Sequence, residues 1–250
     1  MSGHNRWTKI KHQKMAMGNT KGKLFTKVIK EITVAAKMGG GDPAANARLR
    51  SAIEAGRAAN MPNESITRAV KKGTGELEGV NYEELTYEGY GPHGVALMVR
   101  CLTDNKNRTA GDIRSIFTKG GGNMGSDGSV SWMFDRRGVI TVKKGPSEDE
   151  LMEAALDAGA LDVSPSEDGD GAFEVKTEPA DLHKVYTALE AKKVPLAESK
   201  VQFIPKERVH VGGDAAMKVL KLMEMIDDND DVQDIFSNAD IDDSDLEAMA

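Results

Sequence analysis

The stretch ELTYEGYGPHGVALMVRCLT, residues 84–103, divides this 250-residue chain into two kinds of sequence. Residues 84–90 and 95–103 have the pattern of strands, and Gly91-Pro92-His93-Gly94 between them is typical of a tight hairpin turn. The sequence before the hairpin has a helical period, and the sequence after it alternates strands with helices. We therefore expect a helical region followed by an α/β region.

Three amphipathic helices are predicted before the hairpin. Residues 23–38 place apolar side chains on one side of a 3.6-residue repeat, and a basic outer stripe on the other side consists of Lys23, Lys27, Lys30 and Lys37. Three glycines end this helix, and Asp42-Pro43 is a typical start for the next one, which runs to about residue 59. A third helix is predicted for residues 62–72. Short helices on short connectors indicate a bundle.

The α/β region contains an insertion. Residues 138–204 follow the order strand, helix, strand, strand, helix, strand, which is the ferredoxin-like pattern. Residues 82–135 hold two strands, a helix and a further strand at 129–134, so they lack a second helix and a last strand. The helix 214–226 and the strand 232–236 supply both, so we expect the tail to complete this domain.

The predicted fold is therefore a multidomain α+β protein with an N-terminal three-helix bundle and two ferredoxin-like α/β domains, the last inserted into the middle one. The four predicted parts are a flexible basic arm (1–22), the helical bundle (23–78), a discontinuous α/β domain (79–135 with 205–250) and the inserted domain (136–204).

Composition excludes several classes of protein. A single cysteine, Cys101, allows neither an internal disulfide nor a cysteine-based zinc finger, which indicates a reducing, cytoplasmic setting. No stretch has the length and apolar character of a signal peptide or a membrane span. The five histidines are scattered, so no local metal pair is present. We expect no metal, no cofactor and no membrane partner.

Motifs of catalysis are also missing. Two matches to GxGxxG, at Gly89 and Gly120, lie in a hairpin and after a helix, whereas a dinucleotide site needs the motif between a strand and a helix. Cys101 lies in an apolar strand, where a thiol is normally buried and inert. We therefore expect no enzyme and no small-molecule substrate; a site assembled from residues distant in the sequence is the alternative.

Charge is polarised along the chain. Residues 1–80 carry 15 Lys and Arg against 6 Asp and Glu, whereas residues 81–250 carry 18 against 34. The acidic run at residues 227–231 lacks the glycine and the closing glutamate of a calcium loop, so it predicts a solvated, repulsive tail. The N-terminal end is expected to attract polyanions, and the rest of the chain to avoid them.

The basic end predicts a nucleic-acid interface. Cations bound to phosphates release counterions, and an indole stacks on an exposed base. The predicted contacts on the arm and the bundle are Arg6, Trp7, Lys9, Lys11, His12, Lys14, Lys21, Lys23, Lys27, Lys30, Arg50, Arg57, Arg68, Lys71 and Lys72. Asp104 and Asn105 are typical of a helix cap, and Lys106 and Arg108 beside them are a predicted second phosphate contact.

Several blocks in one order, among them GHNRWTKIKHQK, AAKMGGGDPAAN, YEGYGPHG, DNKNRT and GGNMGSDGSVSWMF, resemble the YebC family, which includes the mitochondrial translational activator of cytochrome oxidase. The resemblance covers nearly the whole chain and implies three domains, one interrupted by another. It also implies a regulator of gene expression. Proteins of this family are commonly described as probable transcriptional regulators that bind DNA, and some members resemble ribosome-associated factors that assist translation, notably through proline runs.

Two polymers fit the charge pattern. A glycine-punctuated basic arm with one tryptophan suits folded or single-stranded RNA, whereas specific duplex readers usually present a recognition helix in a symmetric dimer. We therefore expect a monomeric ribosome- or rRNA-associated translation factor; the alternative is a regulator bound to promoter DNA. A protein-binding adaptor that uses the acidic end is a third hypothesis.

Overall fold

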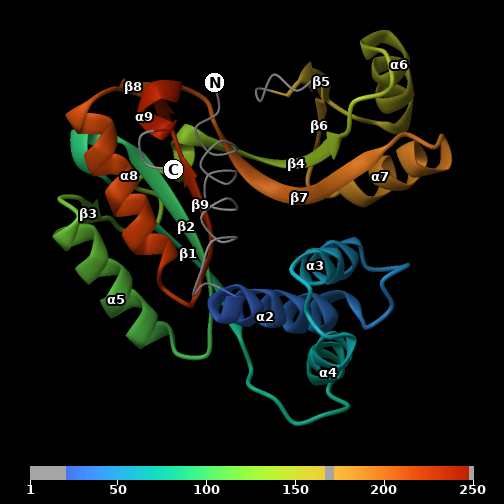
Figure 1. Cartoon of the computed structure of the whole chain (residues 1–250), viewed down its shortest axis with the longest axis horizontal. Helices are drawn as coiled ribbons and strands as arrows, with labels where there is room; N and C mark the ends of the chain where they lie inside the picture. The colour runs from blue at the N-terminus through green and yellow to red at the C-terminus, as the bar shows by residue number, and fades with distance from the viewer. Residues whose placement is uncertain (1–20, 167–171, 248–250) are drawn as a thin grey trace. The chain divides into compact units, whose positions relative to one another are not determined.

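The computed structural model describes residues 21–166 and 172–247. The chain divides into two compact units, one made of residues 1–134 and 205–250 and the other of residues 135–204. Helices come first and sheets follow, so the predicted α+β class is confirmed (Figure 1). No helix in the described part of the chain has the length and apolar character needed to cross a membrane.

Three helices open the first unit: α2 (Lys21–Gly39), α3 (Ala47–Ala58) and α4 (Asn63–Thr74). Their shared core contains Val28, Ile32, Leu49, Ile53 and Ile66. Each of these residues belongs to the apolar stripe of its own helix, so the bundle forms because the stripes can only be buried against one another.

The second helix begins later than the Asp42-Pro43 pair predicts. Asn46 is its N-cap: the side-chain oxygen accepts from the backbone N–H of Leu49 at 3.0 Å, and the side-chain amide donates to the carbonyl of Ala35 at 2.8 Å. Asp42 instead accepts from the N–H of Ala44 in the preceding turn. One asparagine thus starts α3 and fixes it to α2, and asparagine is as good a cap as aspartate.

A four-stranded sheet follows the bundle. Strands β1 (Glu83–Tyr90) and β2 (Ala96–Thr103) form the predicted antiparallel hairpin, and β9 (Val232–Ser237) pairs antiparallel with β2. The tail therefore completes this sheet, as the missing strand predicts. The order β3-β1-β2-β9 differs from a ferredoxin-like order, because the short hairpin makes the first two strands neighbours.

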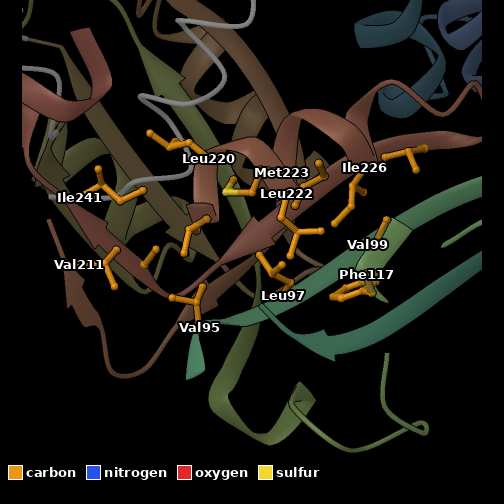
Figure 2. Packing of buried hydrophobic residues seen from close by; sticks show 14 of the residues in the cluster. Val95, Leu97, Val99, Phe117, Val211, Leu220, Leu222, Met223, Ile226 and Ile241 are labelled. Carbon is orange, nitrogen blue, oxygen red and sulfur yellow. The ribbon is translucent and has the colours of Figure 1, made fainter. Parts of the chain in front are cut away.

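The main core lies between this sheet and two helices, α5 (Lys106–Lys119) and α8 (Asp214–Asp227). Figure 2 shows Val95, Leu97 and Val99 of the hairpin facing apolar side chains of both helices. Cys101 is fully buried in the same cluster, and burial raises the pKa of its thiol to about 12. The predicted burial of this thiol is confirmed.

Gly89 and Gly120, the first glycines of the two GxGxxG matches, are needed for close packing. A Cβ on Gly89 would lie 2.7 Å from the ring of Phe117, and one on Gly120 would lie 2.5 Å from Leu222. Helix α5 can lie this close to β1, and α8 this close to the end of α5, because these two positions lack a side chain. Close packing therefore explains these glycines without a nucleotide.

The predicted strand at residues 129–134 is wrong. Ser131–Met133 forms a 3₁₀ turn, η2, and the edge of the sheet is instead β3 (Asn123–Met124). Strand β4 then begins at Phe134. The sequence also gave no sign of the parallel pair β8 (Val209–Val211) and β10 (Ala239–Ile241), nor of the short helix α9 (Asp243–Glu247).

The second unit has the predicted ferredoxin-like order β4-α6-β5-β6-α7-β7. Its strand order across the sheet is β5-β6-β4-β7, and β6 pairs antiparallel with both β4 and β5. Ser147 and Glu150 form a reciprocal capping box at the start of α6. The elements are β4 (Phe134–Val142), α6 (Glu148–Ala158), β5 (Asp162–Pro165), β6 (Phe173–Thr177), α7 (Leu182–Ala191) and β7 (Leu196–Pro205).

Candidate nucleic-acid interface

Lys23, Lys27 and Lys30 lie along one face of α2, because positions four and three residues apart share a helix face. Lys27 and Lys30 are buried, with 6% and 7% of their surface exposed. The predicted outer stripe is therefore wrong for these two lysines. They point toward another part of the same unit.

Their partners lie where α8 ends. The Lys27 ammonium donates to the carbonyl of Asp227 at 2.6 Å and to its carboxylate at 3.0 Å. Lys23 donates to the carboxylate of Asp228 at 3.1 Å, at a more exposed position. Carbonyls at a helix C-terminus carry partial negative charge, so the lysines meet the carboxylates and the helix dipole together.

Asp231 is the most connected acid of the group. Its carboxylate accepts from Lys30 at 2.6 Å, from Arg108 at 2.8 Å and from Thr109 at 2.7 Å. Burial alone would raise the pKa of Asp231, but these hydrogen bonds outweigh it and lower the pKa to about 2. Asp231 is 4% exposed, so this ionised acid lies inside the protein.

We call Lys23, Lys27, Lys30 and the segment 227–231 the charge clamp. The prediction of a solvated, repulsive tail is wrong for Asp231 and Asp227, because both are paired with lysines of α2. The pairing joins residues about 200 positions apart, so no local pattern reveals it. The lysines of α2 form ion pairs with the aspartates that follow α8. The charge clamp therefore attaches the bundle to the α/β core.

A second ionic network links the bundle to the sheet. Arg100, in the middle of β2, binds the carboxylates of Asp234 at 2.6 Å, Glu31 at 3.2 Å and Glu84 at 3.4 Å. Arg48 of α3 binds the same two glutamates, at 2.7 and 2.8 Å. Burial would lower the pKa of Arg100, but the three acids outweigh it and raise that pKa.

Other predicted contacts on the bundle do face solvent. Arg57 on α3 and Lys71 and Lys72 on α4 are exposed. Arg68 is exposed as well and forms a surface ion pair with Glu64 at 2.8 Å. An exposed pair of this kind costs little to break, so Arg68 can exchange its carboxylate for a phosphate.

Two family models together match most of the chain. The model described as "TACO1/YebC protein N-terminal domain" matches residues 5–76, and the model described as "TACO1/YebC second and third domain" matches residues 82–239. The chain belongs to the TACO1/YebC family. The resemblance inferred from the sequence blocks is thereby confirmed.

Curated TACO1/YebC relatives match over the full length. A protein of Myxococcus xanthus is 57% identical over 100% of this chain and 99% of its own, and one of Desulforapulum autotrophicum is 54% identical over 100% of both. Both are named "Probable transcriptional regulatory protein". The crystal structure of the conserved hypothetical protein Aq1575 of Aquifex aeolicus is similar with a TM-score of 0.77 and 46% identity, over 90% of this chain and 92% of that one.

All primary contacts predicted from the sequence fall within the part that the TACO1/YebC N-terminal domain model matches. Those on the arm lie outside the described residues: Arg6, Trp7, Lys9, Lys11, His12 and Lys14. Lys21 opens α2, and its side chain is also outside the description. Arg50 is half-buried and donates to the carbonyl of Pro43 at 3.4 Å.

Lys106 and Arg108, the predicted second phosphate contact, differ in their surroundings. Asn105 caps α5 as expected, accepting from the N–H of Arg108 at 3.1 Å. Lys106 is exposed, whereas the Arg108 guanidinium binds Asp104 at 2.9 Å and Asp231 at 2.8 Å. Because two carboxylates already neutralise its charge, Arg108 stabilises Asp231 of the charge clamp and is not an available cation for a phosphate.

Sequence reasoning missed the residues that hold this TACO1/YebC protein together by charge. Arg100 had one available signal, an arginine inside the apolar run ALMVRCLT, since a buried strand carries such a charge only when it is paired. Glu31 and Asp234 had no comparable signal. In the described parts of the chain, no three His, Cys, Asp or Glu side chains are placed to hold a metal ion.

Proposed function

We propose that this protein is a regulator of gene expression that binds nucleic acid and acts by binding rather than by catalysis. The contacts would be the cations of residues 1–20 together with Arg57, Arg68, Lys71 and Lys72. The observation that carries the proposal is the difference between the two groups of bundle cations: Lys27 and Lys30 are used internally, whereas Lys71 and Lys72 are exposed.

The names of the curated relatives support a role in regulation. For the polymer we propose RNA on the ribosome, where the protein would assist translation through proline-rich stretches. Trp7 within a glycine-punctuated basic segment supports single-stranded or folded RNA, because a base must be unpaired before it can stack on an indole. Promoter DNA is the second candidate, and the name of the relatives, a transcriptional regulatory protein, favours it.

The surface contacts can be tested with a matched pair of variants. Lys71→Ala/Lys72→Ala removes two exposed cations of α4, and Lys143→Ala/Lys144→Ala removes two exposed cations of the second unit. Both variants change the net charge equally. The first is expected to weaken polynucleotide binding and to flatten its salt dependence by about 0.7 to 0.9 in slope per lost contact, and the second to change neither. Equal losses would mean that only net charge matters.

The polymer can be identified by crosslinking the protein in cells and sequencing the attached nucleic acid. We expect rRNA, with much less recovered after Lys71→Ala/Lys72→Ala and undiminished recovery after the control substitutions. Recovery of promoter DNA in place of rRNA would support the second candidate and contradict the first.

A further inference from the structure

Trp132 is a large aromatic side chain in an unusual place. It lies in η2, directly after the glycine-rich segment 120–130, and 65% of its surface is exposed. Tryptophan is normally largely buried, because its ring gains more than most side chains from leaving water. This indole belongs neither to the apolar cores nor to the charge clamp.

The indole is nevertheless held in place. Its Nε1–H donates to the carbonyl oxygen of Ser129 at 3.1 Å, and the hydroxyl of Tyr90 donates to the same oxygen at 3.1 Å. The polar edge of Trp132 is thus already satisfied. What the indole offers a partner is its apolar face.

Glu88 fixes the loop that carries the ring. Glu88 is 8% exposed, and its carboxylate accepts from the backbone N–H groups of Gly128 at 2.9 Å, Val130 at 2.8 Å and Ser131 at 2.8 Å. Burial alone would raise the pKa of Glu88, but the three amides outweigh it and lower that pKa. A charged acceptor therefore holds the loop before any partner arrives, which lowers the entropic cost of binding.

A cation lies at the same turn. The Lys206 ammonium donates to the carbonyl of Trp132 at 2.9 Å, and the Lys206 N–H donates to the carbonyl of Met133 at 2.9 Å. The segment directly after β7 therefore brings a positive charge to the residue that presents the aromatic face. An exposed π-face with a neighbouring cation is the combination that binds a base and its phosphate.

We propose that Trp132 is a stacking site for an unpaired nucleobase, with Lys206 near the phosphate of the same nucleotide. This inference rests on the proposed nucleic-acid function but concerns a site outside the N-terminal domain. A protein partner would need a broader apolar area. The other exposed large apolar side chains described in this unit lie on α2, in the linker after α4 and on α8, apart from Tyr90, which shares the carbonyl of Ser129.

The site can be tested by fluorescence, because the chain has two tryptophans, Trp7 and Trp132. In a Trp7→Phe background, the indole emission reports Trp132 alone. Titration with a single-stranded oligoadenylate is expected to quench this emission, and a duplex of equal length is expected to leave it unchanged. Adding Trp132→Ala to this background should lower affinity for the single strand about tenfold, and Trp132→Phe should lower it less.

A substitution at Glu88 tests the role of the loop independently of the Trp132 ring. Glu88→Gln keeps the ring but turns an acceptor for three amides into a group with its own donors, so we expect weaker single-strand binding with unchanged duplex binding. Melting temperatures of all variants report whether the fold is intact. Wild-type single-strand affinity in a folded Glu88→Gln variant would contradict the role given to the loop.

Three results would overturn the stacking site: bound oligoadenylate without quenching, an equal affinity loss for duplex and single strand, or an unchanged affinity of Trp132→Ala. If Trp132→Ala instead abolishes self-association in sedimentation, the ring is a contact between copies of the chain and the proposal is wrong. In each case salt-dependent binding through the N-terminal cations would persist. If the intact chain binds no polynucleotide at all, the proposed function fails as well.

Discussion

Lys30 and Asp231 form a buried ion pair across 201 positions of the chain, with 2.6 Å between the ammonium nitrogen and the carboxylate oxygen. This pair makes the basic helix α2 a part of the folded core. It also places the most acidic stretch of the protein directly against one of its most basic helices. The two charged ends recognised in the sequence are therefore partly each other's partners.

Asp231→Asn should destabilise the protein strongly. The substitution leaves Lys30 buried without its counter-charge, and breaking one side of a buried pair typically costs about 3–5 kcal/mol. Urea denaturation would measure the free energy of unfolding. Asp228→Asn is the matched control: its partner Lys23 is exposed, so a change within about 1 kcal/mol is expected. Equal effects of the two substitutions would contradict the burial argument.

The same residue predicts a pH dependence. The pKa of Asp231 is lowered from its ordinary value of 3.8 to about 2 in the folded protein, so the folded state holds the ionised form more tightly. Its contribution to stability is therefore complete above about pH 4 and is lost as the pH falls towards 2. As the pH is lowered from 6 to 2, the free energy of unfolding should fall more steeply for the wild type than for Asp231→Asn. Parallel curves would show that Asp231 is not the titrating group.

Arg100 should be essential for attachment of the bundle to the sheet. Arg100→Met leaves Glu31, Glu84 and Asp234 close together without their shared cation, and we expect a loss of about 3–5 kcal/mol in unfolding free energy. Arg100→Lys should also destabilise, because an ammonium lacks the planar fork that serves several carboxylates at once. Arg68→Ala, which breaks the surface pair with Glu64, is expected to change stability by less than about 0.5 kcal/mol. A mild Arg100→Met phenotype would contradict the network.

Lys27 should behave as a structural residue. Lys27→Met keeps the aliphatic stem but leaves the Asp227 carboxylate without this ammonium, so unfolding free energy should fall. The salt dependence of polynucleotide binding should keep its slope, because a buried ammonium releases no counterions from a phosphate. Binding assays are informative here only at temperatures where the variant is folded. A reduced slope of the salt dependence in the folded variant would mean that Lys27 contacts a phosphate, and would contradict its structural role.

Much of the fold follows from local patterns. The three helices, the hairpin around Gly91 and the ferredoxin-like unit are visible as changes of period. The return of residues 232–236 to the first sheet follows from the strand that residues 82–135 lack. The 3₁₀ turn that carries Trp132 could not be predicted from a local pattern, because its backbone is held by Glu88, more than 40 residues earlier. The interface shows the same limit. Charge counts predict which end of the chain carries the proposed interface. They do not distinguish exposed Lys71 from buried Lys30, because the partner of Lys30 is distant in the sequence.

The charge clamp also decides how the central claim must be tested. Removing the bundle would expose Asp227 and Asp231 and unfold part of the core, so a truncated chain would not be a fair comparison. Substitution of Lys9, Lys11 and Lys14 changes no residue of the charge clamp. The most direct measurement is the salt dependence of RNA binding by the folded, full-length Lys9→Ala/Lys11→Ala/Lys14→Ala variant. We predict weaker binding with a slope reduced by about 0.7 per lost contact. A slope and affinity equal to those of the unsubstituted chain would contradict phosphate binding by the N-terminal cations.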